Sequence, residues 1–305
     1  MSNKPRFSPY IQMVLATLLF ACMGVCVKLA SAHFGTAAVV SARGLVGAVM
    51  MAVIAWASGS SLQTKVPMMH LKRGFAGVFA LSLWFYCIGR LPLATAVTLN
   101  YMSSVWLAVY LLIRSGLLGG ARVDRRLVLA VVVGFVGVGL VLHPTLAREQ
   151  IVAGILGVIS GMLAAMAYVQ VTALGRAGEP EVRVVFYFSL TGTVLGAMSW
   201  LIPGLTNPTP LAQMPWTAWA ALIGVGAFAT IAQLLMTRAY AQGRMLVNAS
   251  LQYLGIVHAS VFGMLLFGER LSADGIVGML LIIGAGIVST RLKPADKPAD
   301  QPANK

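Results

Sequence analysis

Long apolar runs alternate with short polar segments along almost the whole chain. Each run holds about 20 residues, and a helix of that length crosses a hydrocarbon core of about 30 Å. The pattern predicts ten membrane-spanning helices, at about 10–32, 36–57, 74–90, 92–113, 127–143, 152–174, 184–202, 216–237, 245–267 and 275–291.

The amino-acid composition also indicates a membrane protein. Of the 305 residues, 59% are hydrophobic and only 10% are charged. A soluble core cannot bury this much apolar surface, which excludes an ordinary soluble enzyme, a disordered protein and a small disulfide-built domain. We therefore expect an all-α polytopic membrane protein that is embedded in the lipid bilayer.

The net charge of +14 would suggest nucleic acid as the partner of a soluble protein, but here the placement of the charges indicates topology. Most of the 22 lysine and arginine residues, Arg73 among them, fall on the side that holds the N-terminus. Only Arg90, Arg148 and Arg270 fall on the other side. By the positive-inside rule both termini are cytoplasmic, and we expect no nucleic-acid partner.

The chain repeats itself. Residues 98–102 (Thr-Leu-Asn-Tyr-Met) align with residues 250–254 (Ser-Leu-Gln-Tyr-Leu), and the glycine-rich residues 137–141 echo residues 284–288. Two halves of five spans follow. Because five is odd, the second half enters the membrane from the opposite side, as in the inverted repeats of secondary transporters.

These halves set the expected domains. The first five-helix repeat covers residues 1–148 and the second, inverted repeat covers residues 149–291. The tail at 292–305 is polar and rich in proline, and we expect it to be disordered and cytoplasmic.

Three further segments carry a family resemblance: Ser41-Ala42-Arg43, Ala239-Tyr240-Ala241 and Gly268-Glu269-Arg270-Leu271. With the duplication, they resemble the EamA family of the drug/metabolite transporter superfamily over about residues 10–291. The resemblance implies ten helices in two inverted repeats. It also implies a small-metabolite carrier of the inner membrane, often an exporter, with a cavity lined by the first, third, fourth, sixth, eighth and ninth helices.

The sequence departs from the family pattern at two places. Gly120-Ala121-Arg122 stands in the first half where an acidic Gly-Glu-Arg element is expected. The proline often found midway in the fourth and ninth helices is also missing, since residues 102–104 and 254–256 hold none. The sequence signal for a helix break at the substrate site is therefore absent.

Asn100 and Gln252 are the strongest candidate substrate contacts, together with Tyr101 and Tyr253. The two amides are related by the repeat, and each lies about 12 Å into the membrane, near the level where inverted-repeat carriers bind substrate. The alternative is hydrogen bonding that joins helices. Further candidates, for which core packing or lipid contact is the alternative, are Trp84, Tyr86, Trp106, Tyr168, Gln170 and Gln233.

Lys28 and Arg43 are cations within predicted spans, where charges normally face a cavity or a partner. If both face a cavity without nearby carboxylates, they favour a substrate that carries a carboxylate or a phosphate. Alternatively, Lys28 snorkels to the interface and Arg43 binds helix-end carbonyls.

All eight acidic residues fall in loops, at helix ends or in the tail, which disfavours ion coupling through a carboxylate and favours uniport or exchange. His258 is the one buried group that titrates near neutrality, although packing is the commoner role of such a histidine. We interpret Glu269, Arg270 and Asp274 as structural. We interpret Glu179, Glu181 and Arg183 as part of a solvated cytoplasmic loop.

The sequence lacks the motifs of an enzyme, such as H-E-x-x-H, G-x-S-x-G or a Walker glycine loop. No cluster of His and Cys suggests a metal, and we expect neither metal nor cofactor. We expect a secondary transporter that exports amino-acid-like compounds or organic anions, as a monomer or homodimer. Import or exchange of a nucleoside-like or vitamin-like compound is the alternative, ahead of a membrane enzyme or scaffold.

Overall fold

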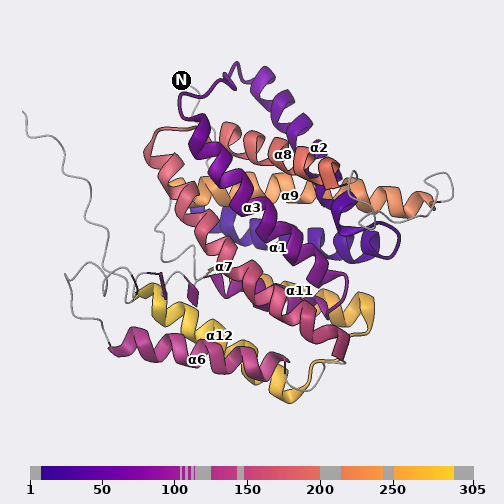
Figure 1. Cartoon of the computed structure of the whole chain (residues 1–305), viewed down its shortest axis with the longest axis vertical. Coiled ribbons are helices and arrows are strands. Elements are labelled where there is room, and N and C mark those ends of the chain that lie inside the picture. Colours follow the sequence, from indigo (N-terminus) through magenta and orange to yellow (C-terminus); the bar gives the residue numbers. More distant parts are fainter. Residues whose placement is uncertain are drawn as a thin grey trace, which may run out of the picture.

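The chain is described by a computed structural model at residues 8–103, 105, 106, 109, 110, 113, 125–142, 148–199, 214–242 and 251–291, which fold into α-helices without a strand (Figure 1). The helices are α1 (Pro9–Ser31), α2 (Thr36–Ala57), α3 (Pro67–Ile88), α4 (Leu93–Tyr101), α6 (Arg125–Leu142), α7 (Arg148–Arg176), α8 (Glu181–Met198), α9 (Trp216–Gln242), α11 (Leu254–Phe267) and α12 (Ala273–Arg291). The predicted disordered tail at 292–305 lies outside the described residues.

Each of the ten predicted spans overlaps one of these helices, and the bounds differ most at the start of α3, the end of α4 and the start of α11. α3 begins at Pro67 rather than near residue 74, because proline at the first helical position needs no backbone hydrogen bond there and already has a helical φ. Arg73, which the charge count assigns to a cytoplasmic loop, therefore lies inside α3. The first residues of the predicted span at 245–267 lie outside the described part of the chain.

The helices carry large apolar side chains on their outward faces. Among the described residues, α1, α2, α3, α7 and α9 are long and apolar enough to cross a membrane, and α6, α11 and α12 contain shorter apolar stretches. Leu45, Val53, Leu265 and Leu280 are each more than half exposed. Such side chains suit lipid rather than water, as in a multi-pass membrane protein.

The helices of the first half pack mainly on those of the second. α1 lies against α9, α2 against α8, α3 against α7, and α6 against α12. Figure 1 shows the last pair side by side at one end of the molecule. The largest core cluster joins both halves and includes Met23, Phe85, Leu99, Ile256 and Ile282.

The chain holds two G-x-x-x-G pairs, Gly157/Gly161 in α7 and Gly192/Gly196 in α8, and glycines of both pairs lie against other helices of the same chain. A Cβ atom on Gly161 of α7 would lie 2.7 Å from the carbonyl oxygen of Leu99 in α4, and one on Gly196 of α8 would lie 2.7 Å from the backbone nitrogen of Ser41 in α2. Because such distances are too short for a methyl group, glycine is what lets these backbones approach.

Two repeat-related segments contain tight turns although neither contains proline. α4 ends at Tyr101, Met102 forms a turn, and Ser103 is helical again; Gln252 and Tyr253 form a turn between helical Leu251 and α11. The backbone N–H groups of Met102 and Gly255 bond to carbonyls three residues back, the spacing of a 3₁₀ turn. The helices are therefore interrupted beside Asn100 and Gln252, a break that the missing proline gave no reason to expect.

Candidate substrate site

A cavity lies among the helices, lined from α1, α2, α3, α4, α7, α8 and α9 and by Gln252 just before α11. Its volume is about 70 Å³, which is space for a few water molecules. Besides small and aliphatic residues, its lining consists of Arg43, Arg73, Trp84, Asn100, Tyr101, Tyr168, Phe188, Gln233 and Gln252 with Thr17 and Phe20. Seven of the residues proposed from the sequence therefore meet here, namely Arg43, Trp84, Asn100, Tyr101, Tyr168, Gln233 and Gln252.

The two amides line this cavity from turn-bearing segments, and both are nearly buried, with 6% of each residue exposed. Asn100 donates a hydrogen bond from Nδ2 to Ser160 Oγ over 2.9 Å, and that hydroxyl donates to the carbonyl of Ala80 over 2.8 Å. Gln252 lies 3.3 Å from the sulfur of Met236. Asn100 thus lines the cavity and also joins α4 to α7 and α3. Its contacts fit both interpretations of this residue, a substrate contact and a hydrogen bond that joins helices.

Two arginines enter the cavity from neighbouring helices. Arg43 of α2 is 4% exposed and Arg73 of α3 is 5% exposed. Their guanidinium carbons lie 4.7 Å and 4.2 Å from the ring centre of Phe188 in α8, within the range of cation–π attraction. Nε of Arg43, and Nε and Nη1 of Arg73, have no hydrogen-bond acceptor among the described residues.

Arg73 is the residue that sequence reasoning missed. It follows Lys72 near the start of a span, where a pair of charges reads as the edge of a loop. The available signal is Gly77, one turn further along α3, because a Cβ atom there would overlap the guanidinium of Arg73. An arginine followed by glycine four residues later on a helix marks room for that side chain to lie along the helix.

Lys28 is not a free cation of the cavity. Its ammonium forms an ion pair with Glu269 and donates to the carbonyl oxygen of Leu91 over 3.0 Å. Both carboxylate oxygens of Glu269 also accept from the backbone N–H of Leu93, at 3.0 Å and 2.8 Å, at the start of α4 where a helix lacks internal acceptors. The condition that no carboxylate lies nearby is therefore not met at Lys28, because the fold brings in Glu269 from the end of α11.

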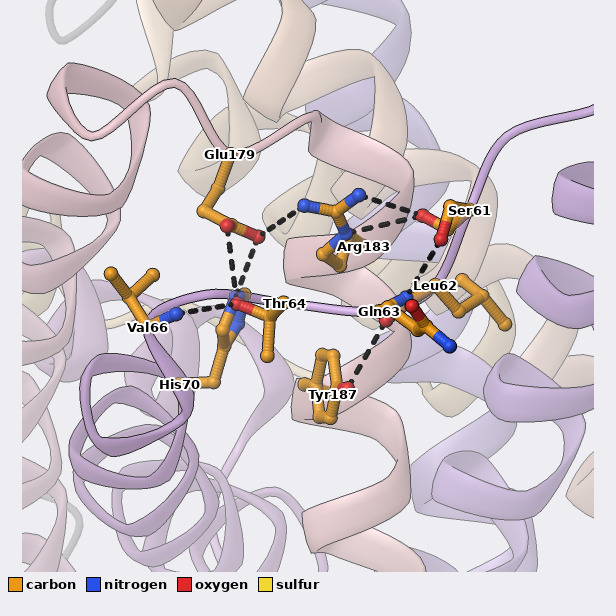
Figure 2. Close-up of polar contacts among 9 residues, drawn as sticks. All are labelled: Ser61, Leu62, Gln63, Thr64, Val66, His70, Glu179, Arg183 and Tyr187. Atoms are coloured by element: carbon orange, nitrogen blue, oxygen red, sulfur yellow. Dashed lines mark hydrogen bonds and ion pairs between the residues drawn. The ribbon is translucent and has the colours of Figure 1, made fainter.

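A second polar cluster lies at the other end of α3. Glu179, between α7 and α8, accepts from Thr64 at 3.1 Å and Arg183 at 3.1 Å and contacts His70 Nε2 at 2.9 Å. Figure 2 shows Arg183 between Glu179 and Ser61, whose carbonyl oxygen it binds at 2.8 Å. The side chain of Glu179 is only 6% exposed, so the predicted solvated loop is instead a packed junction.

The electrostatics of Glu179 follow from this junction. Burial raises the pKa of its carboxyl group, but hydrogen bonds from His70, Arg183 and Thr64, together with the charge of Arg183, outweigh burial and lower the pKa below its ordinary value. The carboxylate is therefore held in its charged form between the two halves of the chain.

The remaining candidates lie outside the cavity lining. Tyr86 stacks its ring on Arg90, 3.7 Å from the guanidinium carbon to the ring centre, and Trp106 packs edge-on against Phe135. Tyr253 is buried in the core, whereas Gln170 and His258 are half-buried. These contacts of Tyr86 and Trp106 are of the packing kind that was the alternative for them, whereas the alternative for Tyr253 was hydrogen bonding between helices.

Among the residues whose side chains are described, the carboxylates lie at the ends of helices or between them, and none lines the cavity: Glu179, Glu181, Glu269 and Asp274. Glu181 pairs with Arg238 at 3.2 Å, and Asp274 is exposed in the first turn of α12. The cavity therefore holds two arginines and, within the part of the chain that is described, no compensating acid.

A helical chain with apolar outward faces and a cavity between its halves has the architecture of a multi-pass membrane protein. Residues 7–143 and 152–291 each match the EamA-like transporter family. The chain belongs to that family.

Its relatives include named transporters. It is 29% identical over 280 residues to the pseudopaline exporter CntI of Pseudomonas aeruginosa, covering 92% of this chain and 95% of that protein. It is 23% identical to the riboflavin transporter of Brucella anthropi, with coverage of 92% and 97%. A crystal structure of a protein with 18% identity superposes with a TM-score of 0.64 over 93% of this chain and 96% of the other, which shows a shared fold.

Proposed function

We propose that this protein is a secondary carrier that exports small polar metabolites, of amino-acid-like or organic-anion type, by alternating access through the central cavity. The observation that carries the proposal is the cavity itself, which is lined from both halves and contains two buried arginines without a described acid. A buried charge is costly in a membrane unless it serves a pathway or a ligand. The rest of the described lining offers amides, hydroxyl groups and the ring of Phe188 to these cations, but no carboxylate.

The contacts between helices support an inverted relation of the halves. α1 packs on α9 as α7 packs on α3, and α1 packs on α11 as α7 packs on α4. α2 meets α8, and α6 meets α12, which are pairs of repeat-related helices. A two-fold relation between halves of five helices produces this pairing, and an odd number of spans makes the relation an inversion across the membrane.

The polar clusters at the two ends of α3 are suited to act as alternating closures. α3 is about 33 Å long at 1.5 Å per residue, and the Glu179 cluster lies at its start while the Lys28–Glu269 pair lies just beyond its end. Each joins the first half to the second. A carrier that opens to one side has to break contacts of this kind at that side only.

The positions of the acidic residues indicate whether transport is coupled to an ion gradient. Proton- and sodium-driven carriers usually hold Asp or Glu near the membrane centre, whereas the described carboxylates here lie at helix ends. Uniport or exchange is therefore the proposed mode. The named exporter among the relatives supports the outward direction, and the named riboflavin transporter keeps a vitamin-like substrate as the alternative. We also propose that the protein lies in the inner membrane with both termini in the cytoplasm.

Reconstitution into proteoliposomes tests this function. Uptake and counterflow are measured with labelled amino acids, organic anions, nucleosides and riboflavin, with and without a pH gradient. Flux that does not depend on the pH gradient but accelerates when substrate is present on the opposite side of the membrane supports an exchanger. Flux that requires the gradient overturns the coupling argument and gives His258 and the cavity tyrosines a role in proton transfer, and no flux of any compound overturns the carrier.

A further inference from the structure

We infer that Arg43 and Arg73 form one binding site for a substrate with two carboxylate groups. The inference rests on the proposed function, because it specifies the substrate of the same cavity. It starts from a feature that the proposal alone does not explain: two guanidinium groups of the same charge converge on one phenyl ring. Since each lies within 5 Å of the ring centre of Phe188, the sum of those two distances is the most that can separate them.

The charge of this site determines how many negative groups it takes. Arginine keeps its charge in proteins, so the two side chains place two positive charges close together in a cavity with little room for water. Among the described carboxylates, Glu179, Glu181 and Glu269 are each paired with another cation. A ligand with one negative charge leaves half of the positive charge uncompensated, whereas a ligand with two neutralises it.

The unused donors specify the form of the negative groups. The free Nε of Arg43 and the free Nε and Nη1 of Arg73 belong to planar forks that bind carboxylate oxygens in pairs. The rings of Phe188 and Trp84 line the same cavity and offer apolar surface to the carbon chain between two carboxylates. Nε1 of Trp84 is a further buried donor that has no acceptor among the described residues.

Matched acid and amide pairs test the charge requirement without changing shape. The probes are succinate against succinamate and glutamate against glutamine, added at equal ionic strength to the purified protein while thermal unfolding is followed by tryptophan fluorescence. Each diacid is expected to bind at least ten-fold more tightly than its amide partner, since one charge-assisted bidentate contact is lost in the amide. Equal binding of the partners, or no stabilisation by any probe, overturns the inference.

Variants assign the effect to the two arginines. Arg43→Gln and Arg73→Gln are each expected to weaken diacid binding at least ten-fold and to remove the preference over the amide. Lys72→Gln, the same charge change on an exposed position of α3, is expected to change neither. Should a glutamine variant fail to fold, Arg43→Lys and Arg73→Lys retain the charge and lose the fork, and an undiminished preference in both overturns the inference.

Transport separates this inference from the proposed function. Proteoliposomes that move none of the labelled compounds overturn the carrier, while the binding experiment still decides the site. Proteoliposomes that move neutral or singly charged compounds as fast as diacids support the carrier and overturn the two-carboxylate site. Preferential flux of a diacid, lost in Arg73→Gln and kept in Lys72→Gln, supports both.

Discussion

Glu269→Gln is the sharpest test of how the two halves are held together at one end. The carboxylate binds the ammonium of Lys28 and accepts from the backbone N–H of Leu93 with both oxygens. Glutamine keeps the shape and one acceptor oxygen but loses the charge. The substitution therefore removes the electrostatics of the junction and leaves its packing almost unchanged.

The expected magnitude follows from burial. Hydrogen bonds to charged groups contribute about 1.5–3 kcal/mol and neutral ones about 0.5–1.5 kcal/mol, so each converted bond loses about 1 kcal/mol. Lys28 loses its counter-ion, and because its side chain is 22% exposed while that of Glu269 is 10% exposed, solvent relieves part of that loss. Together we expect a destabilisation of about 2–3 kcal/mol, including the interaction with the start of α4.

The assay is equilibrium unfolding in mixed micelles, followed by far-UV circular dichroism. Asp274→Asn is the matched control, because it removes the same charge from an exposed position nearby and should change stability by less than about 0.5 kcal/mol. If the pair is coupled, the double variant with Lys28→Gln loses clearly less than the two single losses combined. A Glu269→Gln variant as stable as the Asp274→Asn control would refute the reasoning.

Three further predictions test other parts of the structure. Because the folded-state pKa of Glu179 lies below its ordinary value, its charge stabilises the fold at neutral pH and that contribution is lost as the pH falls below about 4; Glu179→Gln should flatten the acid side of a stability profile measured by thermal unfolding. Gly44→Ala should destabilise by about 1–3 kcal/mol, because a Cβ atom there overlaps the backbone of α8, whereas Gly139→Ala, which faces open space, should leave unfolding unchanged. Asn100→Ala or Gln252→Ala should reduce flux about ten-fold with normal membrane insertion, and normal flux in both and in the double variant would remove them from the site.

The length of apolar runs was enough to locate the helices, because a membrane sets the length of a span. α2 covers Thr36–Ala57, the range that its apolar run predicts. The same reasoning misplaced the start of α3, since it treats Lys72 and Arg73 as too polar for the membrane. The length of an apolar run does not reveal the cavity, where the buried side chain of Arg73 lies beside Gly77 and Phe188.

The repeat identified candidates that hydropathy could not. Asn100 and Gln252 were singled out because they occupy equivalent places in the two halves, and both line the cavity. The partner of Lys28 could not be read from the sequence, because Glu269 stands far away along the chain and meets it only through the packing of α11 beside α1 and α4. Such a pairing depends on tertiary structure, and no local pattern in a single sequence indicates it.

The polar groups of the cavity differ in how far the protein itself satisfies them, and this difference separates two roles. The amide of Asn100 donates to Ser160, which in turn donates to the backbone of α3, so its bonds hold three helices in place before any ligand enters. Arg43 and Arg73 instead retain donors without acceptors. A ligand gains most from groups that the fold leaves unsatisfied, because no internal bond has to be broken first. The arginines are therefore the groups from which we expect substrate selection to arise, whereas Asn100 also holds α4, α7 and α3 together around the cavity.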